Sequence, residues 1–315
     1  MRALVIGAAG QDGSFLCDQL KAAGAEVFGL TRQGMCGPRA FDHSPVMLTD
    51  RAAMMDVIGH GAFDQIYYLA AYHHSAEDRL ELEADVVRRS FAVHVDGLIN
   101  VLDALVTTRS TASLFYAASS HVFGIVTQAP QNEATALAPI CPYGISKTAG
   151  VQLCRLYRSE HRIRASVGFL FNHESPRRPR RFLSRKVARG VVAISRGLLP
   201  RLNLGDLEAR VDWGYSPEYT DAMRRILALD EPGDYVVATG RAACVREFVA
   251  AAFARLGLDW REYVEIDPAL IQKVGRGPLV GNPEKLTQAT GWTARTTLEE
   301  LAALMVDAEL VAGGT

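Results

Sequence analysis

The chain has 315 residues, of which 49% are hydrophobic, and a formal net charge of -1. This length accommodates one large α/β unit or two lobes. Lys and Arg do not outnumber Asp and Glu, which excludes nucleic acid as the expected main partner. No apolar run reaches membrane-spanning length, and the first predicted strand leaves no room for a signal peptide, so we expect a cytoplasmic protein without a membrane partner.

Cysteine and histidine spacing indicates neither disulfides nor a metal site. The five cysteines are scattered and lack a C-x-x-C pair, so we expect reduced thiols. The neighbours His73 and His74 do not by themselves form a zinc-type cluster.

The first half of the chain alternates strand and helix patterns. Apolar runs predict strands at residues 3–7, 26–30, 65–70, 113–119 and 164–171. Amphipathic patterns between them predict helices at residues 13–23, 51–58, 88–107 and 143–161. This alternation predicts an α/β protein with a doubly wound parallel sheet, a Rossmann fold.

After Phe171 the pattern changes, which suggests a second lobe. A Pro- and Arg-rich stretch at residues 175–181 is followed by shorter elements. Residues 234–239 resemble a strand that returns to the sheet, and Thr297 with Glu300 predicts a capping box before a helix at 298–310. We therefore expect a dinucleotide-binding domain at 1–171 and a smaller substrate lobe at 172–315, with the segment at about 234–240 returning to the first.

The glycines at the end of the first strand predict a dinucleotide site. Gly7, Gly10 and Gly13 stand where a strand should lead into a helix. Such glycines allow a tight turn and a close approach of the backbone to a pyrophosphate at a helix N-terminus.

A second set of residues predicts oxidation of an alcohol. Tyr143 and Lys147 are four residues apart and share one helical face. A nearby ammonium and a bound nicotinamide should lower the pKa of the tyrosine, which makes it a base. Ser119 and Ser120 end a predicted strand at the carboxyl edge of the sheet, where ligands bind, and a serine there can hydrogen-bond the reacting alcohol.

Together these motifs resemble the extended short-chain dehydrogenase/reductases, and most closely the GDP-mannose 4,6-dehydratase family. The resemblance spans nearly the whole chain and includes Gly-Gln-Asp-Gly-Ser at 10–14, Leu-Ala-Ala at 69–71, Asn-His-Glu-Ser-Pro-Arg-Arg at 172–178 and Asp-Trp-Gly at 212–214. It implies a Rossmann lobe, a nucleotide-sugar lobe and a homodimer or homotetramer. It also implies cofactor-binding residues (Gly7, Gly10, Gln11, Asp12, Gly13, Leu69, Ala70, Ala71 and His173).

The resemblance further suggests residues for the nucleotide-diphosphate sugar. Asn172 and Arg210 match family positions near the sugar diphosphate. Lys186 belongs to a basic cluster with Arg177, Arg178, Arg180, Arg181 and Arg185 that binds a diphosphate, joins subunits or is a solvated face. We expect Trp213 to pack rather than to touch substrate.

Three departures from the family leave the reaction open. His121 stands where the family has a glutamate that removes the C5 proton, and it either acts as acid and base or fills the pocket. Residues 272–278 replace the run that resembles a guanine clamp, although Arg276 can still meet a diphosphate, so the nucleotide base is open. Residues 46–48 replace a Gly-Asp-Leu run after the third strand, so a polar contact to adenine is lost.

The end of the second predicted strand bears on the choice of cofactor. Residues 31–33, Thr-Arg-Gln, offer no acid for a ribose 2′-hydroxyl, whereas Arg32 can pair with a 2′-phosphate. We therefore expect NADP rather than NAD, the alternative being an exposed arginine with no such role.

These observations predict an enzyme that oxidises C4 of a nucleotide-bound hexose or heptose with a retained nicotinamide cofactor. We place an NDP-sugar 4-epimerase first, because that reaction needs only Ser119, Tyr143 and Lys147. The alternative is a 4,6-dehydratase in which His121 takes the role of the glutamate. A 4-keto-sugar reductase and a non-catalytic NADP(H) sensor are further alternatives.

Overall fold

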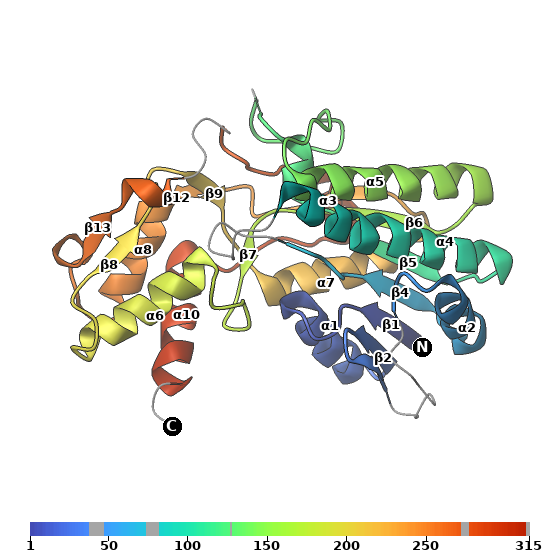
Figure 1. Ribbon diagram of the computed structural model, residues 1–315, viewed down its shortest axis with the longest axis horizontal. Helices are drawn as coiled ribbons and strands as arrows, with labels where there is room; N and C mark the ends of the chain where they lie inside the picture. The colour runs from blue at the N-terminus through green and yellow to red at the C-terminus, as the bar shows by residue number, and fades with distance from the viewer. Residues whose placement is uncertain (38–46, 74–81, 127, 272–276, 313–315) are drawn as a thin grey trace.

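The computed structural model describes residues 1–37, 47–73, 82–126, 128–271 and 277–312 (Figure 1). Its largest sheet has the strand order β11-β6-β5-β4-β1-β2-β3 within these residues. The strands are β1 (Arg2–Ile6), β2 (Glu26–Thr31), β3 (Gly34–Cys36), β4 (Gln65–Tyr68), β5 (Ser113–Ala117), β6 (Ala165–Leu170) and β11 (Asp234–Val237).

All pairs in this sheet are parallel except β2 with β3, which are antiparallel. The five strands predicted in the first half are confirmed to within two or three residues. The short edge strand β3 was not predicted. It follows a turn at Arg32 and Gln33, and its first residue, Gly34, has a φ of 118°, which favours glycine.

Helices cover both faces of the sheet, which confirms the predicted doubly wound fold (Figure 1). Side chains of α1 and α7, among them Leu16 and Met223, pack in one core with Val5 and Val237. A second core lies on the opposite face of the sheet and contains residues of the helices that cover that face. The helices of this layer system are α1 (Gln11–Ala22), α2 (Arg51–Gly61), α3 (Glu83–Phe91), α4 (Gly97–Thr107), α5 (Pro142–His161), α7 (Ser216–Leu227) and α9 (Glu284–Thr290).

The predicted helix at 88–107 starts earlier than expected and is not uniform. Helix α3 begins at Glu83, and the π-helical segment η1 (Ala92–Asp96) joins it to α4. Glu83 and Asp85 lie in the first turn, where acidic side chains favour a helix start. The early start was missed because α3 contributes little to the core, with Ser90 as its one buried residue.

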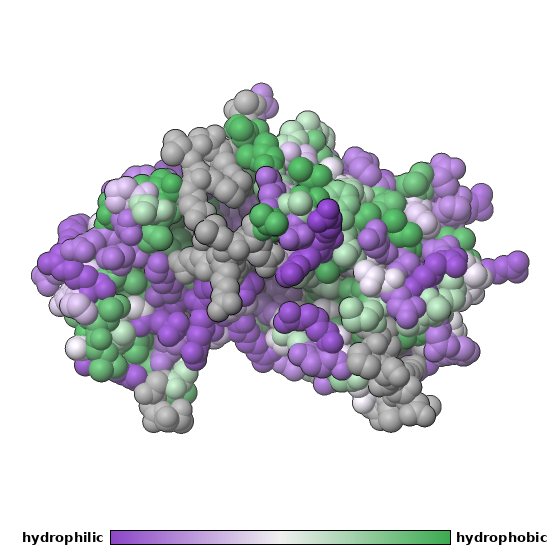
Figure 2. All heavy atoms as spheres, viewed as in Figure 1, coloured by the Kyte–Doolittle hydropathy of each residue, from purple (hydrophilic) through white to green (hydrophobic). Residues whose placement is uncertain are grey.

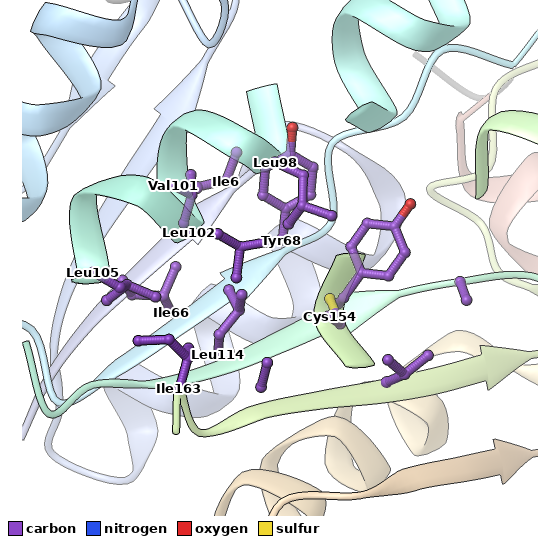
Figure 3. Close-up of a cluster of buried hydrophobic side chains, with 14 of the residues drawn as sticks. Ile6, Ile66, Tyr68, Leu98, Val101, Leu102, Leu105, Leu114, Cys154 and Ile163 are labelled. Atoms are coloured by element: carbon purple, nitrogen blue, oxygen red, sulfur yellow. The ribbon is translucent and has the colours of Figure 1, made fainter. Parts of the chain in front are cut away.

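The continuous helical stretch from Glu83 to Thr107 is long and apolar enough to cross a membrane, by length and composition alone. The expectation that no apolar segment reaches this length was therefore wrong. In the fold this stretch is a core helix, because Leu98, Val101 and Leu102 are fully buried against the sheet residues Ile66 and Tyr68 (Figure 3).

The second part of the chain forms a separate core. Val191, Phe248 and Met305 are among its buried residues, and they come from α6, α8 and α10. Its remaining elements are short strands and the 3-10 helices η3 (Trp260–Glu262) and η4 (Pro268–Leu270). The elements are α6 (Leu183–Ser195), α8 (Val245–Ala254), α10 (Leu298–Ala312), β7 (His173–Glu174), β8 (Leu202–Leu204), β9 (Arg210–Asp212), β10 (Gly214–Tyr215), β12 (Ala242–Cys244) and β13 (Val264–Ile266).

Two predicted details of this part are confirmed. Glu300 accepts a hydrogen bond from the Thr297 backbone at 2.8 Å and donates its own backbone N–H to the Thr297 hydroxyl at 3.2 Å, which is the capping box before α10. Strand β11 lies beside β6, as expected for a returning segment. The surface is hollowed between the two parts on the face that Figure 2 shows, with hydrophilic residues around this notch.

The Asp-Trp-Gly run at 212–214 makes buried contacts where the chain passes between the two parts. Asp212 is 1% exposed, and its carboxylate accepts hydrogen bonds from the Thr239 backbone and hydroxyl at 2.9 and 2.8 Å. Burial raises the pKa of Asp212, although these hydrogen bonds oppose the rise. Trp213 stacks on Phe248 with ring centroids 4.8 Å apart, so it packs as expected.

Candidate active site

The glycine-rich turn between β1 and α1 has no space for side chains. Gly7 has a φ of 95°, and a Cβ on it would lie 2.7 Å from the Ala70 nitrogen. A Cβ on Gly13 would lie 2.2 Å from the Gly7 carbonyl oxygen. No side chain caps α1 at Gly10, so the backbone N–H groups of its first turn are available to an anion. This geometry fits a bound pyrophosphate.

Residues after β4 pack directly against this turn. The Leu69 backbone N–H donates to the Ile6 carbonyl at 2.8 Å, and Ala70 contacts Gly7 through the backbone. Ala71 is exposed beyond them. Leu69, Ala70 and Ala71 therefore border the position predicted for the cofactor.

Side chains of the first turn are bound by the second half of the chain. Gln11 donates to the His173 carbonyl at 3.1 Å, and its amide oxygen accepts from the Ser175 hydroxyl at 2.9 Å. Asp12 accepts from the Ser216 hydroxyl at 2.7 Å and contacts His173. Gln11, Asp12 and His173 thus make a network beneath the turn, and their role toward a cofactor stays a prediction.

Arg32 lies in the turn between β2 and β3 and is exposed. It makes no hydrogen bond or ion pair within the described parts of the chain, so its guanidinium is free to meet a phosphate. Of residues 46–48, Val46 is outside the described residues. Met47 is exposed, and Leu48 packs on the core, which agrees with apolar packing there.

The hydroxyls predicted to be catalytic lie after the carboxyl end of β5 and at the start of α5. Ser119 follows β5 and is 9% exposed, and Ser120 begins a short 3-10 helix and is buried. Cys141 caps α5, where Pro142 is the first residue, so Tyr143 lies in the first turn. The Ser119 hydroxyl hydrogen-bonds the Tyr143 side chain, which brings the two predicted residues together.

Lys147 is buried beneath the tyrosine. Its Nζ donates to the Ala117 carbonyl at 2.7 Å and lies 5.8 Å from the centroid of the Tyr143 ring. Burial lowers the pKa of Lys147 to about 7. The side chain therefore carries a partial charge near neutral pH.

The pKa of Tyr143 differs from the sequence-based expectation. Burial raises it to about 12, although the charge of Arg178 and the hydrogen bond from Ser119 oppose the rise. A lowered value was expected from Lys147 and a bound nicotinamide together. In the protein alone, loss of hydration outweighs the favourable charges.

Three imidazoles surround the Tyr143 ring. The centroids of the His73, His94 and His121 rings lie 4.9, 5.2 and 5.7 Å from it. His121 Nδ1 lies 3.7 Å from the Cys141 Sγ, so the ring is held near the start of α5. The sequence suggested only His121. His73 and His94 were missed, although His73 lies two residues after the Leu-Ala-Ala run that follows β4, the strand next to β5.

His94 is neutral and fixed. Its Nε2 accepts the backbone N–H of Tyr72 at 3.0 Å, which assigns the proton to Nδ1, and Nδ1 then donates to the Ser146 hydroxyl at 2.8 Å. Burial lowers the pKa of His94 well below its usual value. It comes from the π-helical segment, a feature that often marks functional sites.

The structure also places the residues predicted for the sugar diphosphate. Asn172 is exposed after β6, Arg210 is exposed on β9, and Lys186 is half-buried on α6. Arg276 lies outside the described residues. The basic cluster is largely paired inside the protein, because Arg177 contacts Asp18 at 2.9 Å, Arg178 contacts Glu174 at 3.2 Å and Arg185 contacts Glu309.

Among the described residues, no group of three or more His, Cys, Asp and Glu side chains has a geometry that holds a metal. The five cysteines are free thiols, of which Cys154 and Cys244 are buried.

Comparisons with known proteins agree with the fold and the motifs. Residues 4–305 match the family model for GDP-mannose 4,6 dehydratase. The chain is 35% identical to GDP-mannose 4,6 dehydratase 2 of Arabidopsis thaliana, over 98% of this chain and 86% of that protein.

Solved structures of similar fold include epimerases. A putative epimerase from Burkholderia cenocepacia is 28% identical, with a TM-score of 0.82 and 98% of each chain covered. The UDP-glucose 4-epimerase of Thermus thermophilus, solved with NAD, is 25% identical, with a TM-score of 0.78, and the match covers 99% of this chain and 100% of that one. The predicted enzyme class, an NAD(P)-dependent nucleotide-sugar epimerase or dehydratase, is confirmed, while the relatives favour the dehydratase alternative over the epimerase placed first. The chain belongs to the GDP-mannose 4,6-dehydratase family.

Proposed function

We propose that this protein is a nucleotide-sugar 4,6-dehydratase that acts on a GDP-mannose-like substrate and in which His121 replaces the usual glutamate. The observation that carries this proposal is the position of His121. Its ring lies 5.7 Å from the Tyr143 ring and its backbone N–H donates to the Ser119 hydroxyl at 3.3 Å, so an ionisable side chain lies where the family resemblance implies one. The whole-chain match to GDP-mannose 4,6-dehydratases supports it.

The glycine turn and Arg32 suit an NADP cofactor. The tight turn at Gly7, Gly10 and Gly13 leaves the first turn of α1 without a side-chain cap, which suits a pyrophosphate, and the exposed Arg32 offers a charge-assisted pair to a 2′-phosphate. Bound there, the nicotinamide would supply a hydride acceptor for C4 and a positive charge near the phenol.

Tyr143 and Ser119 act on the C4 hydroxyl. Ser119 orients the alcohol through a hydrogen bond, and Tyr143 removes its proton. Because burial holds the pKa of Tyr143 near 12, the tyrosine depends on added positive charge in the loaded site to become a base. Lys147 contributes part of that charge when protonated.

His121 acts next to the oxidised carbon. The C4 carbonyl acidifies the C5 proton, which the neutral imidazole removes. Loss of the C6 hydroxyl as water then requires a proton donor close to C6. The hydride taken from C4 would return to C6 and a proton from solvent would add to C5, which completes the 6-deoxy-4-keto product with no net change in the cofactor.

One observation favours a second candidate, the 4-epimerase. The carboxylate that the family resemblance implies at position 121 is absent, because His121 stands there. Epimerisation needs only Ser119, Tyr143 and Lys147, which are brought together here.

The test is product analysis in deuterated water. Wild-type enzyme with NADP and GDP-mannose should yield a 6-deoxy-4-keto sugar with a C6 methyl signal and deuterium at C5. The variant His121→Glu should keep this reaction, and His121→Ala should lose it while C4 is still oxidised. A C4-epimeric product from GDP-mannose or UDP-glucose without a methyl signal would support the epimerase instead. Steady consumption of external NADPH would indicate a reductase, and no turnover of any nucleotide sugar would indicate a sensor.

The homo-oligomeric state and the division into domains at residue 171 stay predictions, as does the cytoplasmic location. Gel filtration with light scattering tests the first of them directly.

A further inference from the structure

We propose that His73 is a second acid–base residue of this site and forms, with His121, the pair that removes water across C5 and C6. This inference rests on the proposed dehydratase function and names a residue that the family resemblance does not assign. It is drawn from the positions of the rings around Tyr143.

The backbone holds His73 at the edge of the sheet where the reaction is expected. His73 follows β4, which lies beside β5, and the serines of the site follow β5. The preceding residue, Tyr72, donates its backbone N–H to the buried His94. Because His94 is also bound to Ser146 of α5, the loop after β4 is tied to the helix that carries Tyr143.

The ring of His73 lies among the other reactive side chains. Its centroid is 4.9 Å from that of Tyr143 and 6.3 Å from that of His121, with edge-to-face geometry in both cases. On another side it contacts the Phe182 ring at 5.5 Å, so it is half-buried rather than fully solvated.

His94 does not fill the same role. Both of its nitrogens are used by the protein, one as an acceptor and one as a donor, and its neutral form is fixed. The other two histidines whose rings contact Tyr143 are His73 and His121, and their ring positions carry the proposal.

Two imidazoles together perform the acid and base steps that the resemblance assigns to one carboxyl group. Neutral His121 takes the C5 proton, and the electron pair of that C–H bond forms the C5–C6 double bond. Protonated His73 donates its proton to the C6 hydroxyl oxygen, and the C6–O bond breaks with its electron pair on oxygen. One water leaves, and the total number of protons on the two rings is unchanged, so the step needs no oxidant or reductant.

The first experiment compares wild type, His73→Gln, His121→Ala and the surface control His60→Gln, all with NADP and GDP-mannose. We expect His73→Gln to slow formation of the 6-deoxy-4-keto product about 100-fold or more. C4 oxidation, followed by the absorbance of reduced nicotinamide in a single turnover, should persist. The control His60→Gln should behave as wild type, because His60 is paired with Asp56 on the surface.

A second readout needs neither cofactor nor substrate. In the ligand-free protein, His73→Gln removes a charge about one ring spacing from His121, and the midpoint of the His121 imidazole titration, followed by NMR, should rise by about half a pH unit. His60→Gln should leave it unchanged.

The outcomes separate the two proposals. If wild type forms the dehydrated product and His73→Gln forms it as fast, His73 has no acid–base role. If His73→Gln loses C4 oxidation together with dehydration, His73 acts on the structure of the site and the inference is wrong. If wild type gives no methyl product, the proposed function fails, while a shifted His121 titration still supports the pairing of the two rings.

Discussion

His173 Nε2 lies 2.9 Å from Asp12 Oδ2, which joins the strand end after β6 to the first turn of α1. The other ring nitrogen, Nδ1, lies 2.7 Å from the Phe171 carbonyl oxygen. Both neighbours accept hydrogen bonds, so both ring nitrogens act as donors and the imidazole is protonated. The ion pair of Asp12 and His173 is therefore mostly buried, and it stabilises the glycine-rich turn.

This pair predicts a bell-shaped contribution to stability. Burial opposes ionisation of Asp12, but the charge and hydrogen bond of His173 and the Ser216 hydroxyl outweigh it and lower its pKa from 3.8 to about 2. The stability that Asp12 contributes is present above its unfolded pKa and is lost as pH falls through about 2. Burial likewise opposes protonation of His173, yet Asp12 raises its pKa above 6.5, so its contribution is present below 6.5 and is lost as pH rises through the raised value.

We expect Asp12→Asn to lower the free energy of unfolding by about 2 kcal/mol between pH 4 and 6.5, and by less at pH 9. Urea unfolding of wild type and variant across this range measures the difference. Asp18→Asn is the matched control, because its pair with Arg177 is exposed and should contribute little at any pH. If the difference in unfolding free energy between wild type and variant is constant from pH 5 to pH 9, Asp12 does not raise the pKa of His173.

Gly13→Ala should abolish dinucleotide binding. The added Cβ would lie 2.2 Å from the Gly7 carbonyl oxygen, a backbone atom that cannot move away without opening the turn. We expect the affinity for NADP, measured by calorimetry, to fall about 100-fold or more while the sheet stays folded. In the control Gly59→Ala, the new Cβ meets only a Thr108 methyl at 3.2 Å, and NADP affinity should not change.

Local patterns predicted the sheet well. Each buried strand reads as a short apolar run, and the alternation with helices fixes parallel pairing, so β1, β2, β4, β5 and β6 were found. The edge strand β3 is three residues long and has no apolar alternation, and its pairing depends on the turn at Arg32 and Gln33. Such an element has no signal of its own in the sequence.

The candidate site was predicted only in part, for a different reason. Ser119 and Tyr143 carry recognisable motifs, but His73 and His94 become site residues through the contact of β4 with β5 and through a π-helical turn. The adjacency of these strands follows from the predicted topology, so the loop after β4 is predictable as a border of the site. The π-helical turn that aims His94 has no comparable signal in the sequence.

Arg32 should decide between the two nicotinamide dinucleotides. It is exposed beside the end of β2 and is not engaged by other described side chains, so a 2′-phosphate gains a charge-assisted pair without breaking an existing one. We expect Arg32→Ala to weaken NADP binding about 10-fold and to leave NAD binding nearly unchanged. Fluorescence titration of both cofactors measures this, with Gln33→Ala as the neighbouring control. Equal losses for NADP and NAD would mean that Arg32 does not read the 2′-phosphate.

Lys147 should be needed for oxidation at C4 although it does not stabilise the fold. Its Nζ lies 5.8 Å from the Tyr143 ring centroid, and without its charge the phenol keeps the raised pKa that burial imposes. We expect Lys147→Met and Tyr143→Phe each to slow C4 oxidation about 100-fold or more, and the double variant to be little slower than the worse single one, because the two side chains act as a unit.

Stability separates this role from a structural one. Burial lowers the pKa of Lys147 to about 7, so between pH 7 and 10.5 the unfolded chain binds a proton that the folded protein does not. The free energy of unfolding therefore rises with pH across this range, and at pH 7 the lysine is a net cost to the fold apart from its hydrogen bond to Ala117. Lys147→Met should accordingly keep or raise the Tm at pH 7 while oxidation is lost. A variant that loses both Tm and activity would instead identify Lys147 as a structural support of α5.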